Sequence, residues 1–174
     1  MKHLMVFSHG LDSSPQAHKI QWLEPRAAAA GWQTLAPDYQ DQDPEQRVAT
    51  LETAVADQAP DRCVLVGSSL GGVVSVFGAQ RFPVAGLFVM VPAVFWPGYE
   101  HLSYEVTVPV IEVVHAWRDD VVPLERVQRW AELHAAPLHV LPDEHRLANS
   151  RDPLISLFDH FLARLDGTAA DAAT

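Results

Sequence analysis

The sequence contains a single cysteine, Cys63, among its 174 residues. One thiol excludes an intrachain disulfide, which fits a reducing compartment. The amino-terminal apolar run, residues 4–7, ends at Ser8 and is too short for a signal segment or a membrane span. We therefore expect a cytoplasmic protein with no membrane partner.

Basic residues are few. The chain has 12 Lys and Arg against 22 Asp and Glu, a formal net charge of −10 and a sequence pI near 5.2. An acidic surface repels phosphate backbones and anionic lipid, so nucleic acid and membrane surfaces are disfavoured as partners. The same charge slightly disfavours strongly anionic substrates, although a local field can override it.

Several motifs are missing as well. No internal repeat is visible. The segment after the first apolar run carries one glycine, Gly10, and not G-x-G-x-x-G, which argues against a nucleotide-binding Rossmann-like domain. None of the histidines stands in an H-E-x-x-H or similar metal-ligand pattern.

Two kinds of segment alternate along the chain. Short apolar runs rich in β-branched residues predict strands at 4–7, 33–36, 63–67, 87–91, 110–115 and 138–141. Helical spacing of apolar residues predicts helices at 15–30, 44–56, 70–80, 123–134 and 153–165. Strict alternation implies parallel strands joined by right-handed crossovers, with helices on both faces. We expect a three-layer α/β/α sandwich of about six strands in the order 2-1-3-4-5-6.

The length and the 48% hydrophobic content suit one compact domain, placed at residues 1–166. Residues 92–109 form a long connection that interrupts the alternation. Residues 167–174 are small and polar and are expected to be a disordered tail.

The segment G-S-S-L-G-G, residues 67–72, follows a predicted buried strand and opens a helix. It contains G-x-S-x-G in one frame, which makes Ser69 the central serine. A nucleophile on a tight strand-to-helix turn needs small residues two positions away on each side, and Gly67 and Gly71 supply them. The N–H of Leu70, at the helix N-terminus, would face developing negative charge. The alternative is an ordinary strand–turn–helix joint.

A serine nucleophile needs a base, and the base needs an acid that holds its tautomer. Asp119 and Asp120 follow the strand predicted at 110–115, and His145 follows the last strand. Active sites of such sheets gather at the carboxyl ends of strands, so Ser69, Asp119 and His145 are expected to meet. Asp120 suits an N-cap of the next helix, and His115 precedes the acid in the chain, which is the wrong order.

The loop after the first strand, H-G-L-D-S-S-P at residues 9–15, suits a second oxyanion donor. Gly10 lets the chain turn closely, and the N–H of Leu11 is the expected donor. A plain loop with Ser14 or Asp12 capping the following helix is the alternative.

Together these residues resemble the α/β-hydrolase superfamily over nearly the whole chain. The patterns H-G-x-x-S-S-P and G-S-S-L-G-G resemble those of small bacterial esterases without a cap domain. Glu144 and Arg146 beside His145 depart from the small residues that the superfamily often has there.

The resemblance implies a minimal α/β-hydrolase fold and an acyl-enzyme mechanism on a small-molecule ester of short acyl chain, with no metal or organic cofactor. Ser69 would attack the acyl carbon, and His145 would act as general base and then as general acid. Asp119 would orient the imidazole of His145, and the N–H groups of Leu11 and Leu70 would form the oxyanion hole. A thioesterase, an amidase and a non-catalytic binding module on the same scaffold remain alternatives. Candidate pocket residues are His9, Phe95 and Trp96, although aromatic residues of the long connection could equally serve core packing or a dimer contact.

Overall fold

The computed structural model describes residues 1–171. The six strands are β1 (His3–Ser8), β2 (Gln33–Leu35), β3 (Arg62–Ser68), β4 (Gly86–Met90), β5 (Val110–Ala116) and β6 (Leu138–Leu141). The five helices are α1 (His18–Ala29), α2 (Pro44–Gln58), α3 (Leu70–Arg81), α4 (Leu124–Leu133) and α5 (Arg151–Asp171). Strands and helices alternate along the chain except at the connection between β4 and β5.

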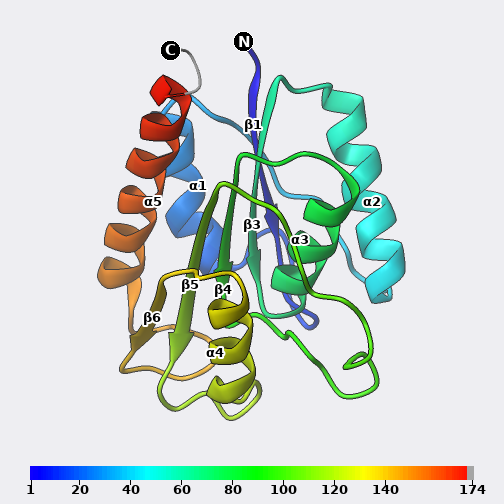
Figure 1. Ribbon diagram of the computed structural model, residues 1–174, viewed down its shortest axis with the longest axis vertical. Helices are drawn as coiled ribbons and strands as arrows, with labels where there is room; N and C mark the ends of the chain where they lie inside the picture. The colour runs from blue at the N-terminus through cyan, green and yellow to red at the C-terminus, as the bar shows by residue number, and fades with distance from the viewer. Residues whose placement is uncertain (172–174) are drawn as a thin grey trace.

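All six strands form one parallel sheet in the order β2-β1-β3-β4-β5-β6 (Figure 1). The predicted strand order and the three-layer architecture are therefore confirmed. The strands run in register: Ser8 pairs with Gly67, and Met90 pairs with both Ser68 and Val114. The loops that follow these strands consequently leave the sheet from one edge.

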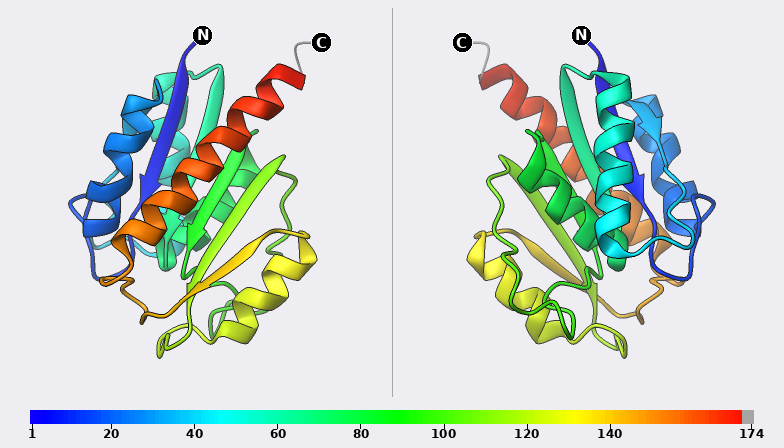
Figure 2. Two further views of the ribbon diagram at one scale, coloured as in Figure 1. Left: turned by 90° about the vertical axis from the view of Figure 1, so that its left-hand side faces the viewer. Right: turned by 90° about the vertical axis from the view of Figure 1, so that its right-hand side faces the viewer.

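The sheet has a separate apolar core on each face, because side chains of a strand alternate between the faces. In β1, Leu4 and Val6 belong to the cluster shared with α2, α3 and α4. Met5 and Phe7 belong to the cluster shared with α1 and α5. Figure 2 shows α1 and α5 side by side on one face and α2, α3 and α4 on the other. Because helices cover both faces of the sheet, successive side chains of an inner strand such as β4 or β5 are all buried. This burial explains the continuous apolar runs that predicted these strands.

Helix α1 begins later than predicted, at His18 and not at residue 15. The N–H of Ala17 donates to the carbonyl of Ser14 at 3.0 Å in a turn before the helix. Ala17 is the N-cap and has no side-chain hydrogen bond, so neither Ser14 nor Asp12 caps this helix. The N-terminus of α1 is therefore left without a capping side chain.

The last two helices also differ from the prediction. Helix α4 begins at Leu124 with Pro123 as N-cap, so Asp120 does not cap it. Helix α5 continues beyond its predicted end at 165, and residues 167–171 are helical. The remainder of the expected tail, 172–174, lies outside the described residues. No helix within residues 1–171 is long and apolar enough to cross a membrane.

Candidate active site

Ser69 occupies the turn between β3 and α3 with φ 54° and ψ −119°, a conformation that costs energy for any residue with a Cβ. The strand and the helix approach closely here. A Cβ on Gly71 would lie 2.0 Å from the carbonyl oxygen of Ser8, and one on Gly67 would lie 2.2 Å from that of Gly71. Only glycine fits at these two positions, and the tight turn projects Ser69 from the carboxyl edge of the sheet.

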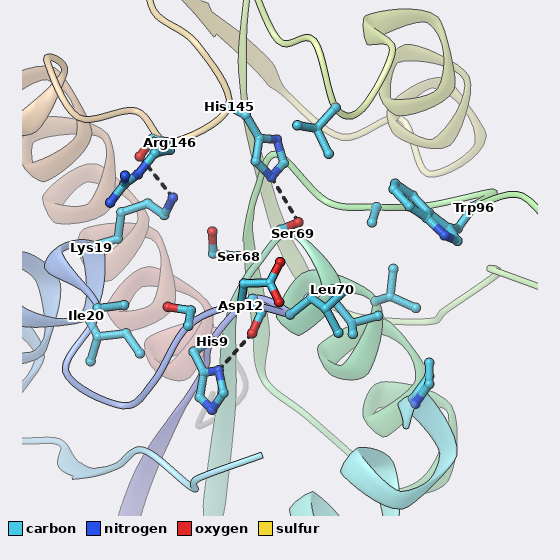
Figure 3. Close-up of a pocket in the computed structure, with 18 of the residues that line it drawn as sticks. His9, Asp12, Lys19, Ile20, Ser68, Ser69, Leu70, Trp96, His145 and Arg146 are labelled. Carbon is cyan, nitrogen blue, oxygen red and sulfur yellow. Dashed lines mark hydrogen bonds between the residues drawn. The ribbon is translucent and has the colours of Figure 1, made fainter. Parts of the chain in front are cut away.

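His145 lies beside Ser69, with its Nε2 3.0 Å from the serine Oγ (Figure 3).

The short loop that carries His145 is organised by Asp143, which is 1% exposed. The Asp143 carboxylate accepts hydrogen bonds from the N–H of Glu144 and from the N–H of Asn149 and the hydroxyl of Ser150. Burial tends to raise the pKa of Asp143, but these donors together lower it. A buried carboxylate thus fixes the loop.

Asp119 lies on the other side of the imidazole. Its two carboxylate oxygens are 2.8 and 3.0 Å from Nδ1 of His145, and Oδ1 also accepts hydrogen bonds from the N–H groups of Val121 and Val122. Burial opposes ionisation, but the hydrogen bonds from His145, Val122 and Val121 outweigh it and lower the pKa of Asp119. The ionised acid favours the tautomer with hydrogen on Nδ1, which leaves Nε2 free to accept the Ser69 proton.

Asp120 and His115, the alternatives for the acid and the base, do not contact Ser69. Asp120 is exposed to solvent. His115 is fully buried behind Asp119: its Nε2 donates to the carbonyl of Val122 at 3.0 Å and lies 3.7 Å from the Asp119 carboxylate. Burial lowers the pKa of His115. The geometry therefore joins Ser69 to His145 and Asp119.

The loop after β1 packs against the serine, since a Cβ on Gly10 would lie 3.5 Å from the Cβ of Ser69. The buried side chain of His9 holds this loop by hydrogen bonds. Its Nδ1 donates to the carbonyl of Gly10 at 2.8 Å, and its Nε2 accepts the N–H of Tyr39 at 2.9 Å. One ring nitrogen donates and the other accepts, which is the pattern of a neutral imidazole. Burial, which lowers the pKa of His9, favours the same neutral form. Leu70 is the first residue of α3, where backbone N–H groups have no partner within the helix.

The sequence did not point to Arg47 of α2, although its guanidinium fixes the same loop. Arg47 is 1% exposed and donates to the carbonyl oxygens of His9, Gly10 and Leu11 at 3.2–3.3 Å. Three carbonyls turned toward one cation orient the peptide groups of the loop. The signal in the sequence is weak: Arg47 stands four residues before Leu51, on the apolar stripe of the helix.

A cavity of about 910 Å³ opens beside Ser69. Its apolar lining includes Leu70, Val73, Phe77, Trp96, Tyr99 and Tyr104. The predicted pocket residues divide: His9 and Trp96 line the cavity, whereas Phe95 is 8% exposed and does not. Phe95 packs on Tyr104, with ring centroids 4.8 Å apart, and under the guanidinium of Arg129 at 4.3 Å. The long connection before β5 thus supplies one wall of the cavity.

The polar lining contains two further groups that the sequence did not point to, Lys19 and His18 at the start of α1. Both donate to the carbonyl oxygen of Arg146, the residue after His145, at 3.0 and 2.9 Å. Within residues 1–171, no group of three His, Cys, Asp or Glu side chains could hold a metal ion.

Comparison with known proteins gives a family match for residues 4–130, to the Uncharacterised protein family (UPF0227). No curated protein is similar enough in sequence to count as a relative. A structure of a candidate hydrolase of the alpha/beta superfamily from Xanthomonas campestris pv. campestris has a TM-score of 0.84 at 30% sequence identity. The match covers 94% of this chain and 99% of that chain.

More distant structures share the fold. Est1E from Butyrivibrio proteoclasticus has a TM-score of 0.84 at 16% identity, over 95% of this chain and 89% of that chain. An alpha-beta serine hydrolase homologue from Coxiella burnetii has a TM-score of 0.73 at 22% identity, over 94% of this chain and 85% of that chain. These distant structures show the same fold over nearly the whole of this chain.

Proposed function

The chain belongs to the Uncharacterised protein family (UPF0227) and to the α/β-hydrolase superfamily, and on this basis we propose that it is a serine hydrolase of carboxylic esters. The observation that carries the proposal is the unbroken chain of hydrogen bonds from Asp119 through His145 to Ser69. Each of these residues follows a different strand at one edge of the sheet, and the serine is in a strained turn beside a cavity.

In the proposed reaction, the Oγ of Ser69 attacks the acyl carbon while Nε2 of His145 takes its proton. The carbonyl π electrons move to oxygen, and the oxyanion accepts the backbone N–H groups of Leu11 and Leu70. The tetrahedral intermediate collapses, the C–O bond to the alcohol breaks, and His145 gives its proton to the departing oxygen. Water, activated by His145, then hydrolyses the acyl-enzyme and regenerates the serine.

Asp119 and Arg47 would assist this reaction without exchanging a proton with substrate. The Asp119 carboxylate stabilises the imidazolium that forms twice in each turnover. Arg47, through the three carbonyls that it binds, holds the peptide of Leu11 for the oxyanion. The cavity of about 910 Å³ lies near the upper end of the range for small-molecule sites, so we extend the expected substrates from short acyl chains to larger esters.

A fluorophosphonate probe together with 4-nitrophenyl acetate hydrolysis tests the proposal. We expect the parent protein to be labelled and to turn over the ester, and Ser69→Ala to lose both. Ser68→Ala is the matched control, because it removes the neighbouring hydroxyl from the same segment and should retain labelling. Labelling that persists in Ser69→Ala, or a parent protein that neither reacts nor hydrolyses, would contradict the assignment.

A further inference from the structure

The cavity beside Ser69 differs in character on its two sides. Figure 3 shows Lys19 and Arg146 on one side of Ser69, and Leu70 and Trp96 on the other. An ester bound with its acyl carbon at Ser69 would therefore place one of its two parts among cationic groups. The other part would lie against the apolar wall.

Lys19 is the central group of the cationic side. Its side chain lies on the wall of the cavity and the residue is 8% exposed. Among the described residues its ammonium has one hydrogen bond, to the carbonyl of Arg146 at 3.0 Å, and no carboxylate within 4.0 Å. That carbonyl already accepts from His18, so it does not require the lysine. Two of the three ammonium donors are left for another acceptor.

The carboxylates of Asp119 and Asp143, which lie near Lys19, are hydrogen-bonded to other groups. Asp119 binds His145, and Asp143 binds donors of its own loop. Two acidic residues also line the cavity: Asp43 caps helix α2, whereas Asp12 acts electrostatically on Arg47 and, among the described residues, has no side-chain hydrogen bond or ion pair. A buried ammonium without a counter-ion is costly to keep charged. Accordingly, burial and, after it, the charge of Arg146 lower the pKa of Lys19 to about 8, although Asp119 and Asp143 act in the opposite direction.

The start of helix α1 adds to the positive character of this side. Residues 17–20 all line the cavity. The helix has no capping side chain and no acidic residue in its first turn, so its N-terminal N–H groups lack a negative partner from the chain. Helix N-termini favour anions through these groups and through the helix dipole.

We propose that Lys19, with Arg146 and the N-terminus of α1, forms a subsite for a carboxylate group of the substrate, so that the enzyme prefers esters that carry an anionic group. This inference rests on the proposed esterase activity and names its substrate class. The net charge of −10 by itself disfavours anionic substrates. Inside the cavity, however, the local cluster of positive groups determines the electrostatic field.

The test compares pairs of esters that differ in one carboxylate. Mono-4-nitrophenyl glutarate and 4-nitrophenyl valerate have equal acyl length, and only the first is anionic on its acyl side. The butyrate ester of 4-hydroxybenzoate and phenyl butyrate place the difference on the alcohol side. We expect kcat/KM to favour the anionic member of one pair by about 10- to 100-fold, the range of a charge-assisted hydrogen bond. No preference in either pair would overturn the inference.

Variants assign the preference to the lysine. Lys19→Met and Lys19→Gln remove the charge, and each should bring the ratio of anionic to neutral kcat/KM close to one. Lys2→Met is the matched control, since Lys2 is the only other lysine of the chain and precedes β1 at the opposite edge of the sheet. It should leave the ratio as in the parent protein.

The ratio separates binding of an anion from a purely structural role of Lys19. If Lys19 only supports the His145 loop, both variants lower activity on both members of a pair equally, and that result would overturn the subsite. Failure of the proposed esterase itself has a different signature, because the neutral esters would then not be hydrolysed by a reaction that depends on Ser69.

Discussion

Asp119 and Asp120 are adjacent in the chain, yet their surroundings differ in every respect that matters to a carboxylate. The Asp119 side chain is 1% exposed and accepts hydrogen bonds from His145 and from two backbone N–H groups. Asp120 is exposed to solvent and caps no helix. The pair therefore offers a comparison in which the same chemical change is made inside and outside the proposed site.

We expect Asp119→Asn to lower kcat for 4-nitrophenyl acetate by about 10³- to 10⁴-fold, because an amide cannot hold His145 in the tautomer that accepts the serine proton. Asp120→Asn should stay within about twofold of the parent protein, as surface substitutions usually do. Steady-state kinetics at saturating ester measures both. Similar losses in the two variants would show that the acid has been misidentified.

The three residues joined by hydrogen bonds were predictable from the sequence, whereas their supports were not. Ser69, Asp119 and His145 each follow an apolar strand, and parallel strands bring their carboxyl ends to one edge. Arg47 and Lys19 lie on helices, where a charged residue is ordinarily solvated. Their burial depends on the packing of α2 and α1 over neighbouring loops, which local sequence patterns do not specify.

Among the elements, the contact of helix α3 with strand β1 sets the position of the serine. A Cβ on Gly71 would overlap the carbonyl oxygen and carbon of Ser8 at 2.0 and 2.5 Å. These are backbone atoms of a paired strand, so they cannot move aside as a flexible side chain can. Any side chain at this position must push α3 away from the sheet.

We therefore expect Gly71→Ala to destabilise the fold by about 3 kcal/mol or more, the upper range for overpacking, and to abolish labelling of Ser69. Gly167→Ala is the control, because Gly167 lies in α5 with no atom within 4 Å of a new Cβ. That change should be neutral or stabilising by up to about 1 kcal/mol. Urea denaturation compares the two, and a stable, active Gly71→Ala protein would contradict this account.

Periodicity predicted every strand and helix, and the differences are confined to their ends. Helix α1 begins three residues late because Ser14 and Ala17 close a turn first. Helix α4 begins at Leu124, one residue after its predicted start, with Pro123 as N-cap. The late start of α1 arises from a hydrogen-bonded turn of the preceding loop, which depends on the folded chain and leaves no periodic signal.

For the molecule as a whole, the buried ammonium of Lys19 makes stability depend on pH in the alkaline range. The pKa of Lys19 is lowered from 10.5 to about 8 in the folded protein, so between these pH values the unfolded chain binds more protons than the folded one. Stability from this group then rises with pH. Burial has the opposite consequence for Cys63 and Tyr39, whose pKa values rise to about 12, because the unfolded chain loses those protons first.

The variant Lys19→Met separates these opposing contributions, since it retains Cys63 and Tyr39 and lacks the ammonium. We expect the free energy of unfolding of the parent protein, relative to Lys19→Met, to increase by up to about 3 kcal/mol between pH 8 and pH 10.5. Urea denaturation of both proteins at several pH values measures this difference, and Lys2→Met gives the baseline for an exposed lysine. A difference that does not change with pH would mean that the Lys19 ammonium is solvated or paired in the folded protein. The electrostatic basis of a carboxylate subsite would then be lost, independently of any measurement of activity.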